Sequence, residues 1–160
     1  MRKVSKGLSS RNLVGNVLVV FFILLIDQLS KFAVVEFLRL GGTVRVLSFF
    51  NIIRVENKGI TFGLLSGTLQ PIILILVSLI IIISLCVGMR GQNRQNQLAI
   101  CMIIGGAIGN VIDRFIHKAV IDFLDFHLLT YHWPAFNIAD SAIVIGVLIL
   151  CLISREEEGA

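Results

Sequence analysis

The chain has 160 residues, of which 56% are hydrophobic and only 15% are charged, and its mean hydropathy is +0.93. These values exclude a soluble globular domain and indicate an integral membrane protein. The formal net charge of +4 does not suggest a nucleic-acid partner.

The first predicted span covers about residues 13–38. Residues 1–12 carry four basic side chains and no acid, and a long apolar run follows. This pattern imitates a secretory signal peptide, but there is no small-residue cleavage site and the helix-compatible pattern continues through residues 27–38. At about 1.5 Å per residue the segment is long enough to cross roughly 30 Å of hydrocarbon with tilt.

Residues 39–70 differ from the predicted span in composition. Gly41 and Gly42 interrupt the helix, and residues 43–57 are rich in Val, Ile, Phe and Thr with partial alternation, which favours strands. Residues 58–71 contain three glycines and end in a proline, which indicates a loop with a short surface helix.

Three further spans are predicted at about 72–88, 98–115 and 135–153, and the polar and aromatic segment 116–134 lies outside the hydrocarbon. Four spans place both termini on one side. The basic residues of segments 1–12 and 89–97 assign that side to the cytoplasm. Segments 39–70 and 116–134 are then extracytoplasmic. We expect one integral membrane domain over residues 1–160, mainly α-helical, with a small β-rich extracytoplasmic part.

Polar side chains gather near the outer ends of these spans instead of scattering through the bilayer. A charged group at the centre of a span costs about 2.5–3.5 kcal/mol, so such residues indicate a functional site. Those on one span are three or four residues apart and share a helix face. They are Asp27 and Lys31 on the first span, Asn110, Asp113 and Arg114 on the third, and Asn137 and Asp140 on the fourth, with Asp122 and Asp125 between.

We hypothesise that two of these acids form a proteolytic pair, because two close carboxyls that share one proton supply both a base and an acid for amide hydrolysis. There is no H-E-x-x-H or G-x-S-x-G motif, and the cysteines and histidines lack metal-ligand spacing. A proton-coupled transporter and a non-enzymatic membrane anchor are the alternatives. Acids at one depth and the lack of an inverted repeat favour the protease over the transporter.

Five sequence blocks in a fixed order resemble the bacterial lipoprotein signal peptidases, also called signal peptidase II. They are DQLSK at 27–31, NKGITF at 57–62, GGAIGNVIDR at 105–114, VIDF at 120–123 and FNIADS at 136–141. Thr61 is a mild departure, because the family often has alanine there.

The resemblance implies an aspartic endopeptidase of the bacterial cytoplasmic (inner) membrane that cleaves prolipoproteins before a diacylglyceryl-modified cysteine, with Asp122 and Asp140 as the catalytic pair. It implies four transmembrane helices, an extracytoplasmic strand-rich cradle and a small helix over the site. Its partners are then prolipoproteins and membrane lipids; no cofactor or metal is implied, and we expect a monomer.

The remaining site residues are expected to support the pair or bind substrate. Asn110 and Asn137 orient the dyad or the substrate backbone, Asn57 and Gly59 shape the cradle or touch substrate, and Asp27 with Lys31 and Asp113 with Arg114 form structural ion pairs. The other features are expected to be structural. The Gly105–Gly109 spacing indicates close helix packing, and Asp125 is expected to be a solvated loop acid. Tyr131 and Trp133 are expected to belong to an interfacial aromatic belt.

Overall fold

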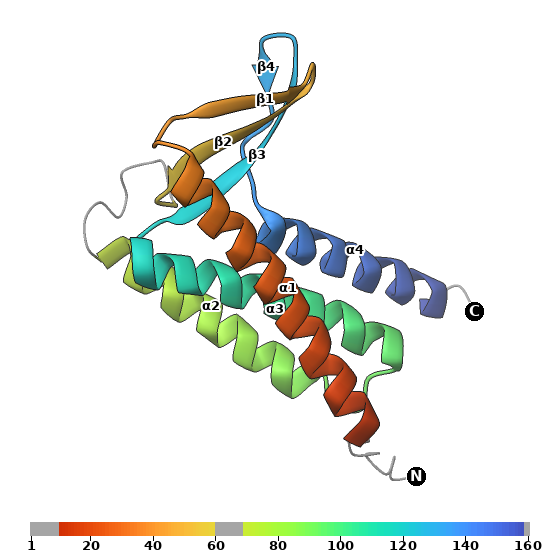
Figure 1. Cartoon of the computed structure of the whole chain (residues 1–160). Helices are drawn as coiled ribbons and strands as arrows, with labels where there is room; N and C mark the ends of the chain where they lie inside the picture. The colour runs from red at the N-terminus through yellow and green to blue at the C-terminus, as the bar shows by residue number, and fades with distance from the viewer. Residues whose placement is uncertain (1–9, 60–68, 159–160) are drawn as a thin grey trace, which may run out of the picture.

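Four long helices form the body of the protein in the computed structural model, which describes residues 10–59 and 69–158 (Figure 1). All four are long and apolar enough to cross a membrane, which confirms the predicted mainly helical membrane fold. The helices are α1 (Ser10–Phe37), α2 (Leu69–Gly88), α3 (Arg94–His117) and α4 (Ile138–Glu158).

Helix α3 lies at the centre of the bundle. Of its apolar window 56% is buried, whereas none of the corresponding window of α2 is, so α2 is the least buried of the four helices. Glycines allow the close approach. A Cβ added at Gly105 would lie 3.1 Å from the Cβ of Ile23 on α1, and one added at Gly106 would overlap the Ala139 carbonyl of α4. The expected role of the Gly105–Gly109 spacing in close packing is confirmed.

The second part is a four-stranded antiparallel sheet in the order β1-β2-β3-β4. The strands are β1 (Thr43–Leu47), β2 (Phe50–Asn57), β3 (Val120–Leu128) and β4 (Tyr131–His132). The strands expected within 39–70 are therefore confirmed. Segment 116–134, predicted only to lie outside the hydrocarbon, supplies the other two. The short surface helix and Thr61 fall on residues outside the described ranges.

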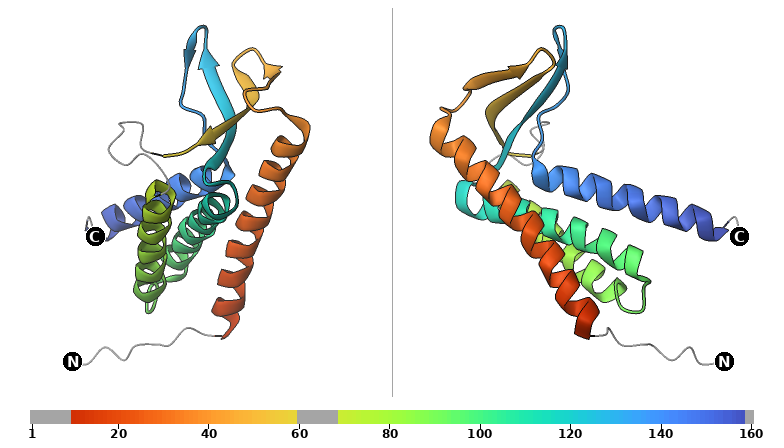
Figure 2. Two further views of the ribbon diagram at one scale, coloured as in Figure 1. Left: turned by 90° about the vertical axis from the view of Figure 1, so that its left-hand side faces the viewer. Right: turned by 45° about the vertical axis from the view of Figure 1, so that its right-hand side comes forward.

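The sheet is attached directly to the ends of the helices. Strand β3 follows α3 after a left-handed cap at Lys118 (φ 59°), and Phe136 bridges to Leu124 of β3 immediately before α4. Because residues 135–137 take part in this connection, α4 begins at Ile138 instead of near residue 135. From this junction the sheet extends beyond the helix ends (Figure 2), and its strands cross the direction of α3 and α4 in Figure 1.

A small apolar core joins the sheet to the bundle. It consists of buried Val34 from α1 and of Ile121 and Phe123 from β3, with Leu38 and Ile138 packed against them. Apolar burial of this kind contributes about 25 cal/mol per Å² and fixes the position of β3 on the helix ends.

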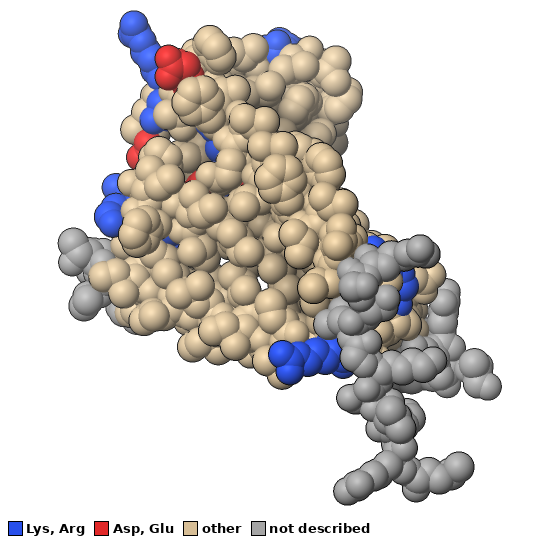
Figure 3. Space-filling view, turned by 60° about the horizontal axis from the view of Figure 1, so that its bottom comes forward, with Lys and Arg blue, Asp and Glu red and all other residues tan. Residues whose placement is uncertain are grey.

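A buried polar cluster joins α1 and α3 at the opposite end of the bundle. The Asn16 side chain donates a hydrogen bond to Gln97 Oε1 over 3.2 Å, and Arg94 donates to Asn16 Oδ1. The Gln97 amide in turn donates to the Gln92 carbonyl over 2.9 Å. These polar groups are satisfied within the protein, as a membrane interior requires. On the face shown in Figure 3 the charged side chains lie toward its margins.

Candidate functional site

Asp122 is the first of two acids at the junction of helices and sheet. It lies on β3 and is 2% exposed. Both of its carboxylate oxygens accept hydrogen bonds from amides. The Asn137 side chain donates to Oδ1 over 2.7 Å, and Asn57, at the end of β2, donates to Oδ2 over 2.9 Å. The side-chain Oδ1 of Asn57 accepts the backbone N–H of Gly59 over 2.9 Å, and the φ of 94° at Gly59 favours glycine.

Asp140 is the second acid, and it lies half-buried in the first turn of α4. Its Oδ1 accepts a hydrogen bond of 2.8 Å from the Asn110 side chain of α3, and its backbone N–H donates to Asn137 Oδ1 over 2.9 Å. Asn137 therefore caps the start of α4. The prediction that Asn137 and Asp140 share a face of one helix is wrong, because Asn137 precedes the helix.

One side chain thus connects the two segments that carry the acids. The Nδ2 of Asn137 binds the carboxylate of Asp122, while its Oδ1 holds the backbone of Asp140. Asn137 itself is fully buried at 0% exposure. The fixed size of one amide therefore limits the separation of β3 from the start of α4.

Lys31 is the centre of a buried charge cluster next to the acids. Its Nζ lies 2.8 Å from Asp27 Oδ2 and 2.9 Å from Asp113 Oδ2, and it donates to Asn110 Oδ1 over 3.1 Å. All three charged side chains are at most 4% exposed. The predicted pairing of Asp27 with Lys31 is confirmed.

The predicted pairing of Asp113 with Arg114 is wrong. Asp113 pairs with Lys31, and Arg114 donates to the Asn110 carbonyl oxygen over 3.3 Å; among the described residues no carboxylate is within 4 Å of its guanidinium nitrogens. The physical reason is that neighbouring residues of a helix point in different directions. Arg114 nonetheless lies close enough to interact electrostatically with Asp140, Asp113 and Asp122.

The cluster also holds the backbone beside each acid. Asp27 Oδ1 accepts the N–H of Ala139 over 2.9 Å, and Asp113 Oδ2 accepts the N–H of Ile121 over 3.1 Å. Ala139 directly precedes Asp140, and Ile121 directly precedes Asp122. Lys31 binds both of these carboxylates, so one ammonium group ties together the supports of both acids.

The protonation of Asp122 is shifted by its surroundings. Burial raises the pKa of Asp122 to about 6, and the nearby charge of Asp140 acts in the same direction. The hydrogen bonds from Asn57 and Asn137 oppose this shift. A carboxyl with a raised pKa beside a second carboxyl is suited to holding and exchanging a proton near neutral pH.

Asp125 is not the solvated loop acid that the sequence suggested. It lies on β3, is 4% exposed, and accepts hydrogen bonds of 2.8 Å from both Asn51 and His132. Burial alone would raise its pKa, but these two partners outweigh burial and hold the pKa below its usual value. Asp125 forms a separate clasp within the sheet, and its hydrogen bonds do not connect it to Asp122.

The fold and the site together define a membrane protein with several spans that gathers carboxylates and amides where its helices meet a small sheet. Residues 19–155 match the family model described as Signal peptidase (SPase) II. The chain belongs to the signal peptidase II family. It is accordingly a multi-pass protein of the bacterial inner membrane that processes the signal peptides of prolipoproteins.

Curated relatives and solved structures agree with this assignment. The chain is 43% identical over 130 residues to the lipoprotein signal peptidase of Thermodesulfovibrio yellowstonii, covering 81% of this chain and 87% of the relative. It is 43% identical over 138 residues to that of Paraburkholderia phytofirmans, covering 84% and 80%. A bacterial membrane enzyme structure obtained by the in meso method at 2.3 Å superposes with a TM-score of 0.79 and 31% identity, covering 90% of this chain and 89% of that one.

Proposed function

We propose that the chain is an aspartic endopeptidase in which Asp122 and Asp140 act together on a water molecule, and that it cleaves prolipoproteins before the diacylglyceryl-modified cysteine. The observation that carries this proposal is the double contact of Asn137. It binds the Asp122 carboxylate and the Asp140 backbone, so two acids from separate elements are held at one place.

The two carboxyls share one proton in the proposed reaction. The ionised carboxylate takes a proton from water, whose oxygen attacks the scissile carbonyl carbon, while the protonated carboxyl donates to the carbonyl oxygen. The amine then leaves with a proton returned by the dyad. Because the pair titrates jointly, the proton belongs to the dyad and not to one residue.

The other site residues have positioning roles in this proposal. Asn57, Asn110 and Asn137 orient the carboxylates through direct hydrogen bonds. Asp27, Lys31 and Asp113 hold the backbone beside each acid. The backbone N–H of Gly59 holds the side-chain Oδ1 of Asn57. The positive charge of Arg114 stabilises the negative charge that develops on the substrate oxygen.

We place the site at the extracytoplasmic face and both termini in the cytoplasm. The acids lie where α1 and α3 end and α4 begins, whereas the α2–α3 connection with Arg90 lies at the opposite end of the bundle. The positive-inside rule assigns that basic end to the cytoplasm. A lipid-anchored peptide would then reach the acids by lateral diffusion, with its acyl chains still in the bilayer.

The test is precursor cleavage at matched expression by wild type, Asp122→Asn and Asp140→Asn. Each variant should lose at least about 10²- to 10⁴-fold in rate, the usual contribution of a general acid or base. Asp125→Asn is the matched control, because it makes the same change on the same strand, and it should retain cleavage. Cooperative thermal unfolding of the two dyad variants shows that their fold is intact. Cleavage by either dyad variant at the wild-type rate contradicts the proposal.

The lipid requirement is tested separately with lipidated and unlipidated forms of one precursor. We expect the lipidated form to be cleaved faster. Equal rates for both forms contradict delivery along the membrane but leave the role of the aspartates unaffected.

A further inference from the structure

The end of the sheet that lies farthest from the two acids carries a cluster of large apolar side chains in contact with solvent. Their exposed fractions range from 40% to 87%. We call this cluster the aromatic tip, and it consists of Phe49, Phe126, Leu128, Leu129, Tyr131 and Trp133. Residues 126–136 contain no Lys, Arg, Asp or Glu, and of the two histidines there His132 is paired with Asp125.

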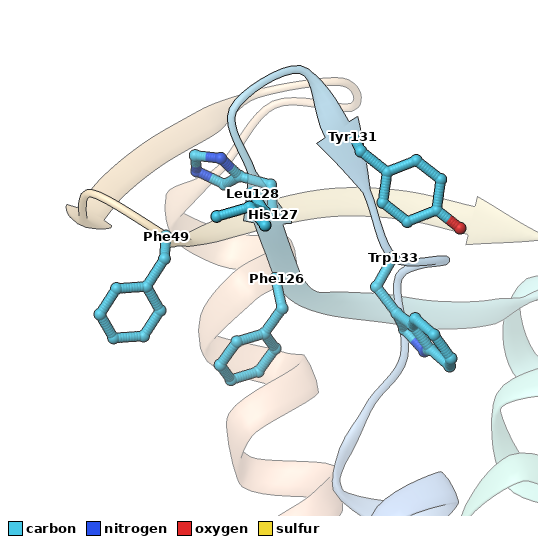
Figure 4. Close-up of a pocket in the computed structure, with 6 residues that line it drawn as sticks. All are labelled: Phe49, Phe126, His127, Leu128, Tyr131 and Trp133. Atoms are coloured by element: carbon cyan, nitrogen blue, oxygen red, sulfur yellow. The ribbon is translucent and has the colours of Figure 1, made fainter.

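The aromatic tip is hollowed. Phe49, Phe126, Leu128, Tyr131 and Trp133 line, together with one histidine, an open hollow of about 230 Å³. Figure 4 shows the rings of Phe49, Phe126 and Trp133 directed toward the side of the sheet on which the helices lie. The apolar rings thus face the same way as the bundle.

The aromatic tip is held rigidly by buried contacts. Asp125, directly beside Phe126, accepts hydrogen bonds from Asn51 and His132 and so joins β2, β3 and β4. The backbone N–H of Trp133 donates to the backbone carbonyl of Phe126 over 2.8 Å, which closes the β3–β4 hairpin. A fixed, uncharged apolar surface of this kind is typical of an interaction site.

The position of the aromatic tip identifies its partner. The sheet is attached at the helix ends, at the boundary where the spans leave the hydrocarbon, and its strands cross the direction of α3 and α4 in Figure 1. Exposed apolar residues continue along this boundary, with Phe37 (84%) at the end of α1 and with Phe115 (73%) and Ile116 (62%) at the end of α3. Large exposed apolar side chains are thus present both at these helix ends and at the tip.

We infer that the aromatic tip inserts into the boundary between headgroups and acyl chains of the same leaflet, so that phospholipids fill the hollow and cover the rings. Tyr and Trp prefer this boundary because their rings are apolar while their polar atoms can still reach water. The lipid contact holds the far end of the sheet on the bilayer surface. This inference depends on the membrane topology and not on the proposed catalysis.

The chain offers a direct reporter, because Trp133 is its only tryptophan. The full-length protein is placed in bilayer nanodiscs made with phospholipids brominated either near the headgroup or near the end of the acyl chain. We expect Trp133 emission to be quenched more strongly by the shallow bromines than by the deep ones. Aqueous iodide should quench it less than it quenches free tryptophan.

Leu128→Asp combined with Leu129→Asp should move the tip into water, and quenching by brominated lipid should be lost while quenching by iodide rises. Arg39→Asp is the control, because it changes the net charge by the same amount at an exposed position at the root of the sheet. Wild-type emission that is insensitive to brominated lipid overturns the inference. If that emission is also shielded from iodide in a manner that depends on protein concentration, a second copy of the chain covers the tip instead.

Discussion

Lys31→Met removes the central charge of the buried cluster while keeping the length of the side chain. In the native protein its Nζ lies 2.8 Å and 2.9 Å from the carboxylates of Asp27 and Asp113 and 3.1 Å from Asn110 Oδ1. The variant leaves two buried carboxylates without their cation. Breaking a buried pair by removing one partner costs about 3–5 kcal/mol, so the folded-to-unfolded ratio should fall by roughly a hundred- to several thousand-fold.

The measurement is reversible unfolding in mixed micelles titrated with a denaturing detergent. Lys118→Met is the matched control, because Lys118 is exposed and, among the described residues, its ammonium group contacts the Phe115 carbonyl and ring alone. The control should change stability by no more than about 0.5 kcal/mol. We also expect Asp113→Asn to cost less in the Lys31→Met background than in wild type, because it then removes an uncompensated charge. Equal stability of the Lys31 and Lys118 variants, or additive effects of the Lys31 and Asp113 substitutions, would refute this reasoning.

Three further predictions concern the acids and the helix packing. Burial raises the pKa of Asp122 from its ordinary 3.8 to about 6, so its contribution to stability is complete below pH 3.8 and lost as the pH rises through about 6. Unfolding midpoints measured across this pH range should decline in wild type relative to Asp122→Asn. If the two proteins show the same dependence of the midpoint on pH, the raised pKa is contradicted. Gly109→Ala places a Cβ 2.5 Å from Asp27 Oδ2 and should destabilise by about 1–3 kcal/mol. Gly88→Ala, whose added Cβ has no atom of the described residues within 4 Å, should not destabilise in the same assay. The pKa of Asp125 is lowered, so the stability that Asp125 contributes is present above about pH 4 and lost on acidification. Asp125→Asn should therefore reduce the fall in the unfolding midpoint that wild type shows at acidic pH. An unchanged fall would show that the contacts of Asp125 with Asn51 and His132 do not stabilise the sheet.

The spans could be predicted from the sequence because length and hydropathy are local properties. Strand β3 could not, since Asp122 and Asp125 are unusual strand residues and both are buried only because partners on other segments bind them. The residue that could have indicated the burial of Asp125 lies on another strand, because Asn51 is opposite Asp125 in the β2–β3 register. Pairings of this kind depend on register and are not visible along one segment.

The site was predicted as a set of residues but not as a network. Sequence spacing brought Asp27 and Lys31 together because residues four apart on a helix are neighbours. It did not indicate that Asp113 joins the same lysine from another helix, nor that Asn137 caps α4. Both contacts connect segments far apart in the chain, and their partners are set by tertiary packing.

Helices α1 and α3 are fastened to each other by polar contacts at two levels. Asn16 and Gln97 meet near one end, and Lys31 meets Asp113 near the other, with an apolar stretch between them. A slip of one helical turn, about 5.4 Å, would separate both sets and move their polar groups into hydrocarbon. Piston-like sliding of α1 along α3 is therefore strongly opposed, and the enzyme must adapt to bilayers of different thickness by tilting this pair as one unit.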